Sequence, residues 1–143
     1  MQLQRAREGV LEAVSGLTDE QASRPGADGW SIKDHLAHLT AWHEMRFFEI
    51  GRIARGGRAA FPDSPDERID PVNALFAENR RGLPLTQVLA DLEFAWEMVA
   101  QAVAACPEDR LDQRLYAGIG LAGGAEHDIA HAEVIAALRS NTP

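Results

Sequence analysis

The sequence from 31 to 55 reads SIKDHLAHLTAWHEMRFFEIGRIAR. Apolar side chains recur in it every three or four residues, which is the period of an amphipathic helix rather than of a strand. Ser31 can cap the first free backbone N–H groups, and Asp34 three positions later completes a box-like capping arrangement. Gly56 and Gly57 then predict where the helix stops. We therefore predict one long helix, beginning after Ser31 and ending at about Arg55.

The rest of the chain shows the same helical period, and no stretch alternates convincingly between apolar and polar residues. We predict an all-α fold with a single domain over residues 1–143: a four-helix bundle, up-and-down with longer connections. An irregular all-α fold built from the same helices is the alternative. Further helices are predicted from Gln2 to Gly16, from Asp70-Pro71 (cap and first residue) to Asn79, from Pro84 to near Cys106 and from near Ala125 to Arg139. The connections between them are predicted to be irregular at Leu17–Trp30, around Pro62-Asp63-Ser64-Pro65 and at Pro107–Gly124.

Composition and charge argue against several classes of function. The 143 residues are 45% hydrophobic and 25% charged, the balance of a globular protein. A net charge of −8 repels phosphate backbones, so no nucleic-acid partner is expected, and the arginines at 52, 55 and 58 are interpreted as a solvated helix end. Cys106 is the only cysteine, which excludes an intramolecular disulfide and a cysteine-based metal site. No signal-peptide pattern and no membrane-length apolar run is present, which predicts a cytoplasmic protein without a membrane partner.

The five histidines fall into two groups along the chain. His127 and His131 are four positions apart on the last predicted helix, so their rings project from nearly the same face. That spacing suits the chelation of one metal ion by two imidazoles. Asp128 follows His127 where a metalloprotease helix has glutamate, so the protease signature is incomplete. The alternative is a pair of neutral histidines packed at a helix start, where the helix dipole disfavours a protonated ring.

A third ligand would come from the helix at 31–55, which carries His35, His38 and His43. At about 100° per residue, His43 projects near the middle of the apolar face, His35 lies on that face and His38 lies at its edge. A central histidine is often a core residue bonded to a neighbour, whereas an edge histidine leaves room for water at a metal. Position alone does not choose among the three.

A resemblance to a known family bears on this choice. The segment Gly29-Trp30-Ser31-Ile32-Lys33-Asp34-His35-Leu36-Ala37-His38-Leu39 resembles the second-helix motif of the DinB-like superfamily, a Trp-Ser opening followed by a helix with a histidine in its second turn. His127 and His131 are similar to the histidine pair on that family's last helix. The superfamily includes YfiT-like metal-dependent hydrolases and thiol-dependent transferases. The resemblance implies a four-helix bundle, frequent dimerisation and a divalent ion, Zn or Ni first and Mn or Fe next, held by His38, His127 and His131.

The resemblance assigns no role to His35 or His43, and we predict that His43 is a core residue or supports a ligand. Three imidazoles are neutral ligands, so a bound ion keeps its double positive charge and lowers the pKa of a bound water or binds a thiolate. We therefore predict a metal-dependent enzyme that transfers a low-molecular-weight thiol to an electrophilic small-molecule substrate. The alternatives are a metal-dependent hydrolase, a non-catalytic stress-associated ligand-binding bundle and a bundle without metal.

Catalytic residues stay unassigned at this point. Glu44, Glu126 and Asp128 are candidate proton acceptors, although solvated surface is the simpler interpretation of each. Cys106 is predicted to be structural because it has no base near it in the sequence. Tryptophans 30, 42 and 96 are predicted to belong to the core, and Tyr116 lies in the glycine-containing loop before the last helix.

Overall fold

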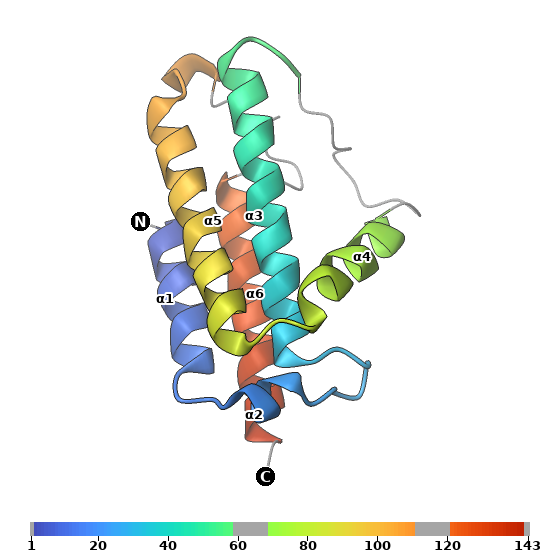
Figure 1. Ribbon diagram of the computed structural model, residues 1–143. Coiled ribbons are helices and arrows are strands. Elements are labelled where there is room, and N and C mark those ends of the chain that lie inside the picture. Colours follow the sequence, from blue (N-terminus) through green and yellow to red (C-terminus); the bar gives the residue numbers. More distant parts are fainter. Residues whose placement is uncertain (1, 59–68, 111–120, 142–143) are drawn as a thin grey trace.

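The computed structural model describes residues 2–58, 69–110 and 121–141, and this part of the chain is helical with short connections (Figure 1). The predicted all-α class is confirmed. None of the described helices is long and apolar enough to cross a membrane. In chain order the helices are α1 (Gln2–Val14), α2 (Asp19–Ser23), α3 (Ile32–Ala54), α4 (Ile69–Arg81), α5 (Leu85–Ala105), the 3₁₀ turn η1 (Glu108–Arg110) and α6 (Leu121–Ser140).

Four long helices form the bundle, with α3 packed on α5 and α1 packed on α6 (Figure 1). The helices α3 and α5, which pack together, do not run in opposite directions. Leu36 in the first half of α3 shares an apolar cluster with Leu92 in the first half of α5, and Ile53 near the end of α3 shares another with Cys106. Thus α3 and α5 run the same way. The connection through α4 returns the chain to the starting end, so the simple up-and-down order that we predicted does not hold for α3 and α5.

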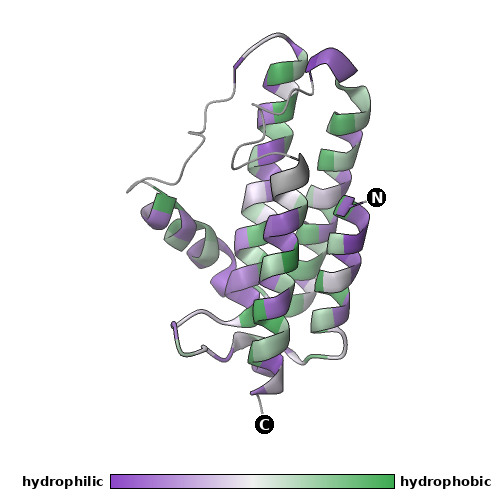
Figure 2. Cartoon of the chain, turned by 180° about the vertical axis from the view of Figure 1, so that it is seen from behind, coloured by the Kyte–Doolittle hydropathy of each residue, from purple (hydrophilic) through white to green (hydrophobic). Residues whose placement is uncertain are grey.

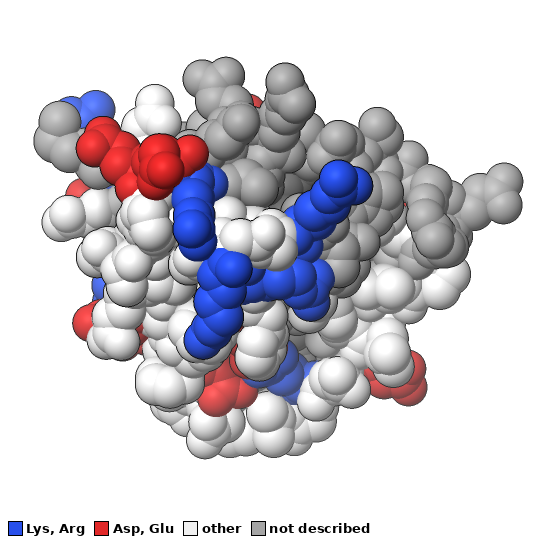
Figure 3. Space-filling view, turned by 90° about the horizontal axis from the view of Figure 1, so that it is seen from above, with Lys and Arg blue, Asp and Glu red and all other residues white. Residues whose placement is uncertain are grey.

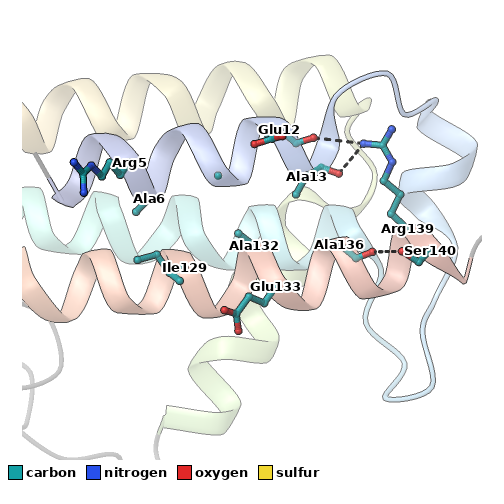
Figure 4. Close-up of a pocket in the computed structure, with 11 residues that line it drawn as sticks. Arg5, Ala6, Glu12, Ala13, Ile129, Ala132, Glu133, Ala136, Arg139 and Ser140 are labelled. Carbon is teal, nitrogen blue, oxygen red and sulfur yellow. Dashed lines mark hydrogen bonds between the residues drawn. The ribbon is translucent and has the colours of Figure 1, made fainter.

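Small residues lie where α1 meets α6. Ala6 is buried at this contact, and Ala132 lines the same shallow groove of about 470 Å³ (Figure 4). At one end of the groove, Arg139 donates to the backbone oxygens of Ala13 at 3.1 Å and Glu12 at 3.5 Å. These oxygens lie near the end of α1, where carbonyl groups lack a partner within the helix. The arginine therefore joins the ends of two helices that run in parallel.

The capping box predicted at the start of α3 is confirmed. The Ser31 hydroxyl accepts from the N–H of Asp34 at 3.1 Å, and the Ser31 N–H donates to an Asp34 carboxylate oxygen at 2.9 Å. Such a cap contributes about 0.5–2 kcal/mol. Apolar and polar residues are interspersed along each helix (Figure 2). The core has fully buried apolar side chains from four helices, among them Val10, Leu36, Leu39, Val88, Leu92 and Ile135.

The connection predicted to be irregular at Leu17–Trp30 contains the short helix α2, so that prediction was wrong in part. Thr18 and Gln21 form a second reciprocal capping box: the Gln21 N–H donates to the Thr18 hydroxyl at 3.2 Å, and the Thr18 N–H donates to the Gln21 side chain at 3.0 Å. The pattern Thr-x-x-Gln is itself a start signal for a helix. It was the available signal for α2.

Lys33, the chain's only lysine, joins three segments at one end of the bundle. Its ammonium group is buried and donates to Asp19 of α2 at 3.2 Å and to the backbone oxygen of Leu83 at 2.6 Å. Asp19 also accepts from the N–H of Leu85 at 2.6 Å. That backbone bond, followed by the lysine, lowers the pKa of Asp19. The start of α3 is therefore held against α2 and the start of α5.

The helix α4 begins at Ile69, so Asp70 and Pro71 lie within its first turn instead of forming its cap and first position. It ends at Arg81, two residues beyond the predicted Asn79. Boundary differences of this size are common where helix ends tighten or fray. Two sequence-based predictions fall outside the described residues, namely the loop around Pro62-Asp63-Ser64-Pro65 and the position of Tyr116, and so does most of the connection predicted at Pro107–Gly124.

The helix α6 begins at Leu121, before the predicted start near Ala125. Gly124, predicted to be part of a loop, is therefore helical. A Cβ atom at this position would lie 3.1 Å from Nε of Arg46 on α3. Because glycine has no Cβ, it leaves the space that the Arg46 side chain occupies where α6 passes α3.

Basic side chains gather over the end of the bundle where α3 stops (Figure 3). Arg55 donates to the backbone oxygen of Gly51 at 2.7 Å, and Arg110 of η1 donates to the backbone oxygen of Ala54. Arginine near a helix C-terminus satisfies free carbonyl groups and suits the negative end of the helix dipole. The cluster is thus a capped helix end, in line with the interpretation from sequence.

Candidate metal centre

Two helices bring three of the five histidines to one point. His38 lies in the second turn of α3, and His127 and His131 lie one turn apart on α6. One nitrogen from each ring belongs to a group of atoms that all lie within 4.8 Å of one another. His38 is buried, and the other two are half-buried. We call these three side chains the histidine triad; they are the three residues predicted as metal ligands.

The rings of the triad face a shared volume. Nε2 of His38 lies 2.9 Å from Nε2 of His127. Two nitrogens bound to one tetrahedral ion at about 2.0–2.1 Å would lie roughly 3.3 Å apart, so a small outward movement would admit an ion. The ring of His131 closes the third side, with its centroid 4.7 Å from that of His38 and 4.6 Å from that of His127. The donor set therefore has dimensions that suit a transition metal.

The surroundings keep all three rings neutral. Burial, followed by repulsion from the other two members of the triad, lowers the pKa of His38 to about 2. Burial is also the main cause that lowers the pKa of His127 to about 3 and that of His131 to about 4. A neutral imidazole is the form that coordinates metal. Neutral nitrogen donors suit Zn and Ni better than Mg or Ca, which prefer oxygen.

Buried nitrogens without a partner also mark this site. Nδ1 of His38 and Nδ1 of His127 are buried and have no hydrogen-bond partner among the described residues. Buried polar groups are nearly always paired, so unpaired ones in a cluster call for an explanation. In the tautomer that leaves Nε2 free for an ion, each of these Nδ1 atoms carries the proton. The Nε2 atoms of these two rings, which lie 2.9 Å apart, are then the nitrogens available for an ion.

Two tryptophans form one wall of the site. The ring centroid of Trp30 lies 5.4 Å from that of His38, and the centroid of Trp42 lies 6.3 Å from it on the same helix. Trp42 donates its indole N–H to Asn73 at 2.9 Å and contacts the ring of Phe76, both on α4. The helix α4 therefore packs against α3 at Trp42, next to His38. Trp42 and Trp96 are core residues as predicted, whereas Trp30 is only half-buried.

His43 is excluded from the triad by its own partners. It is fully buried, and its Nε2 lies 2.8 and 2.9 Å from the two carboxylate oxygens of Asp128. Its Nδ1 lies 3.2 Å from a guanidinium nitrogen of Arg46, which can only donate. Burial lowers the pKa of His43, so the ring is neutral, with its proton on Nε2 donated to Asp128. His43 is thus a core histidine bonded to neighbours, one of the two predicted roles.

Asp128 is not a solvated surface residue, so the simpler interpretation from the sequence was wrong. It is fully buried on α6 and accepts from His43 and from the indole N–H of Trp96 at 3.0 Å. These bonds join α3, α5 and α6 through one carboxylate. Because both donors occupy it, Asp128 is engaged in holding the bundle together and is not a free base. The signal in the sequence was its position between two histidines of the inner face.

The other candidate side chains named from the sequence are paired elsewhere, exposed or buried in the apolar core. Glu44 forms an ion pair with Arg80 at 2.6 Å, and Glu126 is exposed. Cys106 is buried at the end of α5 in an apolar cluster with Ile50, which fits its predicted structural role. None of these three side chains belongs to the group of possible ligands found in the described part of the chain.

His35 is the fourth histidine at this end of the bundle. It lies one turn before His38 on α3 and is 5% exposed. Its Nδ1 lies 3.0 Å from Nδ1 of His131, and its ring packs against Trp30 with centroids 5.2 Å apart. Neither composition nor helical period distinguished its role from that of His38. The difference is one of distance: His38 lies within hydrogen-bond distance of His127 and packs against the ring of His131, whereas His35 lies within hydrogen-bond distance of His131.

The fold and the site agree with one family. No curated protein and no solved structure matches the chain. A family model described as the DinB superfamily matches residues 2–141, which is nearly the whole chain. The helical bundle and the histidine triad occur within that match. The chain belongs to the DinB superfamily.

Proposed function

We propose that the protein binds one divalent transition-metal ion through the histidine triad and uses it in catalysis. The observation that carries this proposal is the convergence of His38, His127 and His131 within 4.8 Å. Three protein ligands leave further coordination positions for water or substrate, as in catalytic rather than structural zinc sites. Zn and Ni are the ions that this neutral nitrogen set favours, with Mn and Fe as further candidates.

The charge balance of the site supports an anionic partner for the ion. Bound there, a divalent ion would supply Lewis-acid chemistry and lower the pKa of a coordinated water or thiol. The triad contributes no negative charge, and the nearby Asp128 already accepts from His43 and Trp96. An exogenous thiolate or hydroxide therefore fits the remaining position. We propose transfer of a low-molecular-weight thiol to an electrophilic small molecule, with metal-dependent hydrolysis as the alternative.

Two further parts of the proposal concern the setting of the protein. The buried, lone Cys106 suits a reducing compartment such as the cytoplasm. Large apolar side chains remain exposed on the bundle, among them Phe48 at 60% and Phe94 at 66% exposure. Exposed apolar surface of this kind supports self-association, and we propose a homodimer. Sedimentation of the purified chain measures this directly; a monomer at micromolar concentration would contradict it.

The metal proposal is tested with protein purified without an affinity tag. Elemental analysis should find about one equivalent of metal in the wild type, or in metal-stripped protein after reloading with Zn²⁺. His127→Ala should lose the metal because two remaining imidazoles form a weak site. Glu126→Ala is the matched control, since it changes an exposed neighbour on the same helix. Equal metal content in His127→Ala and wild type would refute the site.

The thiol proposal needs a separate readout. Cobalt replaces zinc in such sites and reports its ligands through its visible spectrum. A small thiol added to the Co²⁺-loaded protein should produce a sulfur-to-cobalt charge-transfer band, and His127→Ala should not show it. If the loaded wild type binds cobalt but gives no band with thiols, thiol transfer is refuted, and hydrolysis by a metal-bound hydroxide remains.

A further inference from the structure

We propose that His35 positions the metal centre: it accepts the Nδ1–H of His131 and so leaves Nε2 of that ring free for the ion. This inference rests on the proposed metal binding and adds a residue to it. The contact that carries it is the 3.0 Å distance between the Nδ1 atoms of His35 and His131. His35 comes from α3 and His131 from α6, so the bond also crosses the helix pair that builds the site.

The chemistry of two neutral imidazoles makes this contact directional. A hydrogen bond between two ring nitrogens needs one N–H and one lone pair, and each neutral ring carries a single N–H. If His131 donates from Nδ1, its Nε2 keeps a lone pair for a metal. If His35 donates instead, the proton of His131 sits on Nε2 and blocks ligation there. Metal binding through Nε2 therefore selects the first arrangement, and the presence of His35 stabilises it.

The outer nitrogen of His35 shows that folding alone does not explain this residue. With Nδ1 accepting from His131, the proton of His35 must lie on Nε2. That atom is buried and has no partner among the described residues. A buried N–H without an acceptor costs free energy of folding, and an apolar side chain at the same place avoids that cost. His35 thus carries a polar ring where the stability of the bundle favours a leucine, as is common at functional sites.

The other members of the triad lack such support. Nδ1 of His38 and Nδ1 of His127 have no partner within the described residues. Metal-binding histidines commonly donate their second ring N–H to a neighbouring group, and that bond sets the tautomer and orientation of the ring. In this chain His35 supplies it for His131. The ring of Trp30 packs against His35 and holds it from the outer side.

The test compares His35→Leu with His35→Asn in metal-stripped and reloaded protein. Leucine fills the space and cannot accept, whereas the asparagine side-chain oxygen can take the place of Nδ1. Zinc affinity is measured by competition with a chromophoric chelator, and stability of the metal-free forms by urea unfolding. We expect His35→Leu to bind zinc about 10–100-fold more weakly while its unfolding midpoint stays equal or rises. His35→Asn should recover most of the affinity.

Opposite signs for affinity and stability are what separate positioning from a structural role. Unchanged zinc affinity in His35→Leu would overturn the inference, as would a joint fall of affinity and stability that asparagine does not relieve. The visible spectrum of the Co²⁺-loaded His35→Leu protein should also shift, because the ring of His131 is no longer oriented. If the wild type itself binds no metal, the proposed function fails first; if the wild type and His35→Leu bind equally, only the role of His35 fails.

Discussion

Replacing Asp128 by alanine should severely destabilise the bundle, whether or not metal is present. The Asp128 carboxylate is fully buried and accepts from His43 on α3 and from Trp96 on α5. It is also the charge that favours the protonated form of Arg46, whose side chain is 2% exposed. One substitution therefore removes an acceptor shared by two buried donors and a negative charge that favours the buried guanidinium group of Arg46.

The size of the loss follows from these contacts. A buried donor left without a partner costs about 1–3 kcal/mol, so His43 and Trp96 together lose about 2–6 kcal/mol. Arg46 adds to this, because Asp128 is also a charge that favours the protonated form of its buried guanidinium group. These contributions share one network and do not add fully. We expect a net loss of about 4 kcal/mol or more, a large part of the roughly 5–15 kcal/mol by which such a domain is stable.

Urea unfolding of chelator-treated protein, followed by circular dichroism, measures the effect without any contribution from metal. Glu126→Ala, an exposed carboxylate on the same helix, is the control and should change stability by less than about 0.5 kcal/mol. His43→Ala should destabilise the protein while leaving zinc affinity closer to wild type than His38→Ala does. A loss below about 1 kcal/mol for Asp128→Ala would show that the buried network contributes little.

Three further predictions concern the metal-free protein. Its free energy of unfolding should fall as the pH drops from 7.5 to 5, because the folded triad has pKa values of about 2, 3 and 4 against 6.5 for an ordinary histidine. The unfolded chain then binds protons first, at a cost of at most about 1.4 kcal/mol per histidine for each pH unit below 6.5; a urea midpoint that does not change with pH would contradict this. Gly124→Ala should lower the midpoint of thermal unfolding, because its Cβ would lie 3.1 Å from Nε of the buried Arg46. Gly9→Ala on α1 is the matched control: its Cβ meets no atom within 4 Å, so it should raise the free energy of unfolding by up to about 1 kcal/mol. Lys33→Met should lower the unfolding midpoint by leaving the backbone oxygen of Leu83 unpaired, and a variant as stable as wild type in urea would show that this anchor is dispensable.

Local signals in the sequence determined most of the secondary structure. The period of apolar residues and the Ser31–Asp34 capping box predicted α3 to within about one residue, because both act over three or four positions. The same helical period placed His127 and His131, four residues apart, on one face of the last helix. Thr18–Gln21 carried an equally local signal for α2 that the interpretation missed. The start of α6 was misplaced because its glycines indicate a loop, whereas Gly124 is helical and lies beside Arg46 of another helix.

Tertiary structure decided which histidines of α3 meet that pair. His35, His38 and His43 lie on or near the same inner face, so helical period places all three toward the core without ranking them. The choice depends on how α3 is rotated and shifted along α6, which is set by side chains from four helices. In that packing His38 reaches the pair, His43 meets Asp128 and His35 meets His131. Sequence alone thus determined that a histidine site faces the bundle, and packing at ångström scale assigned each ring its partner.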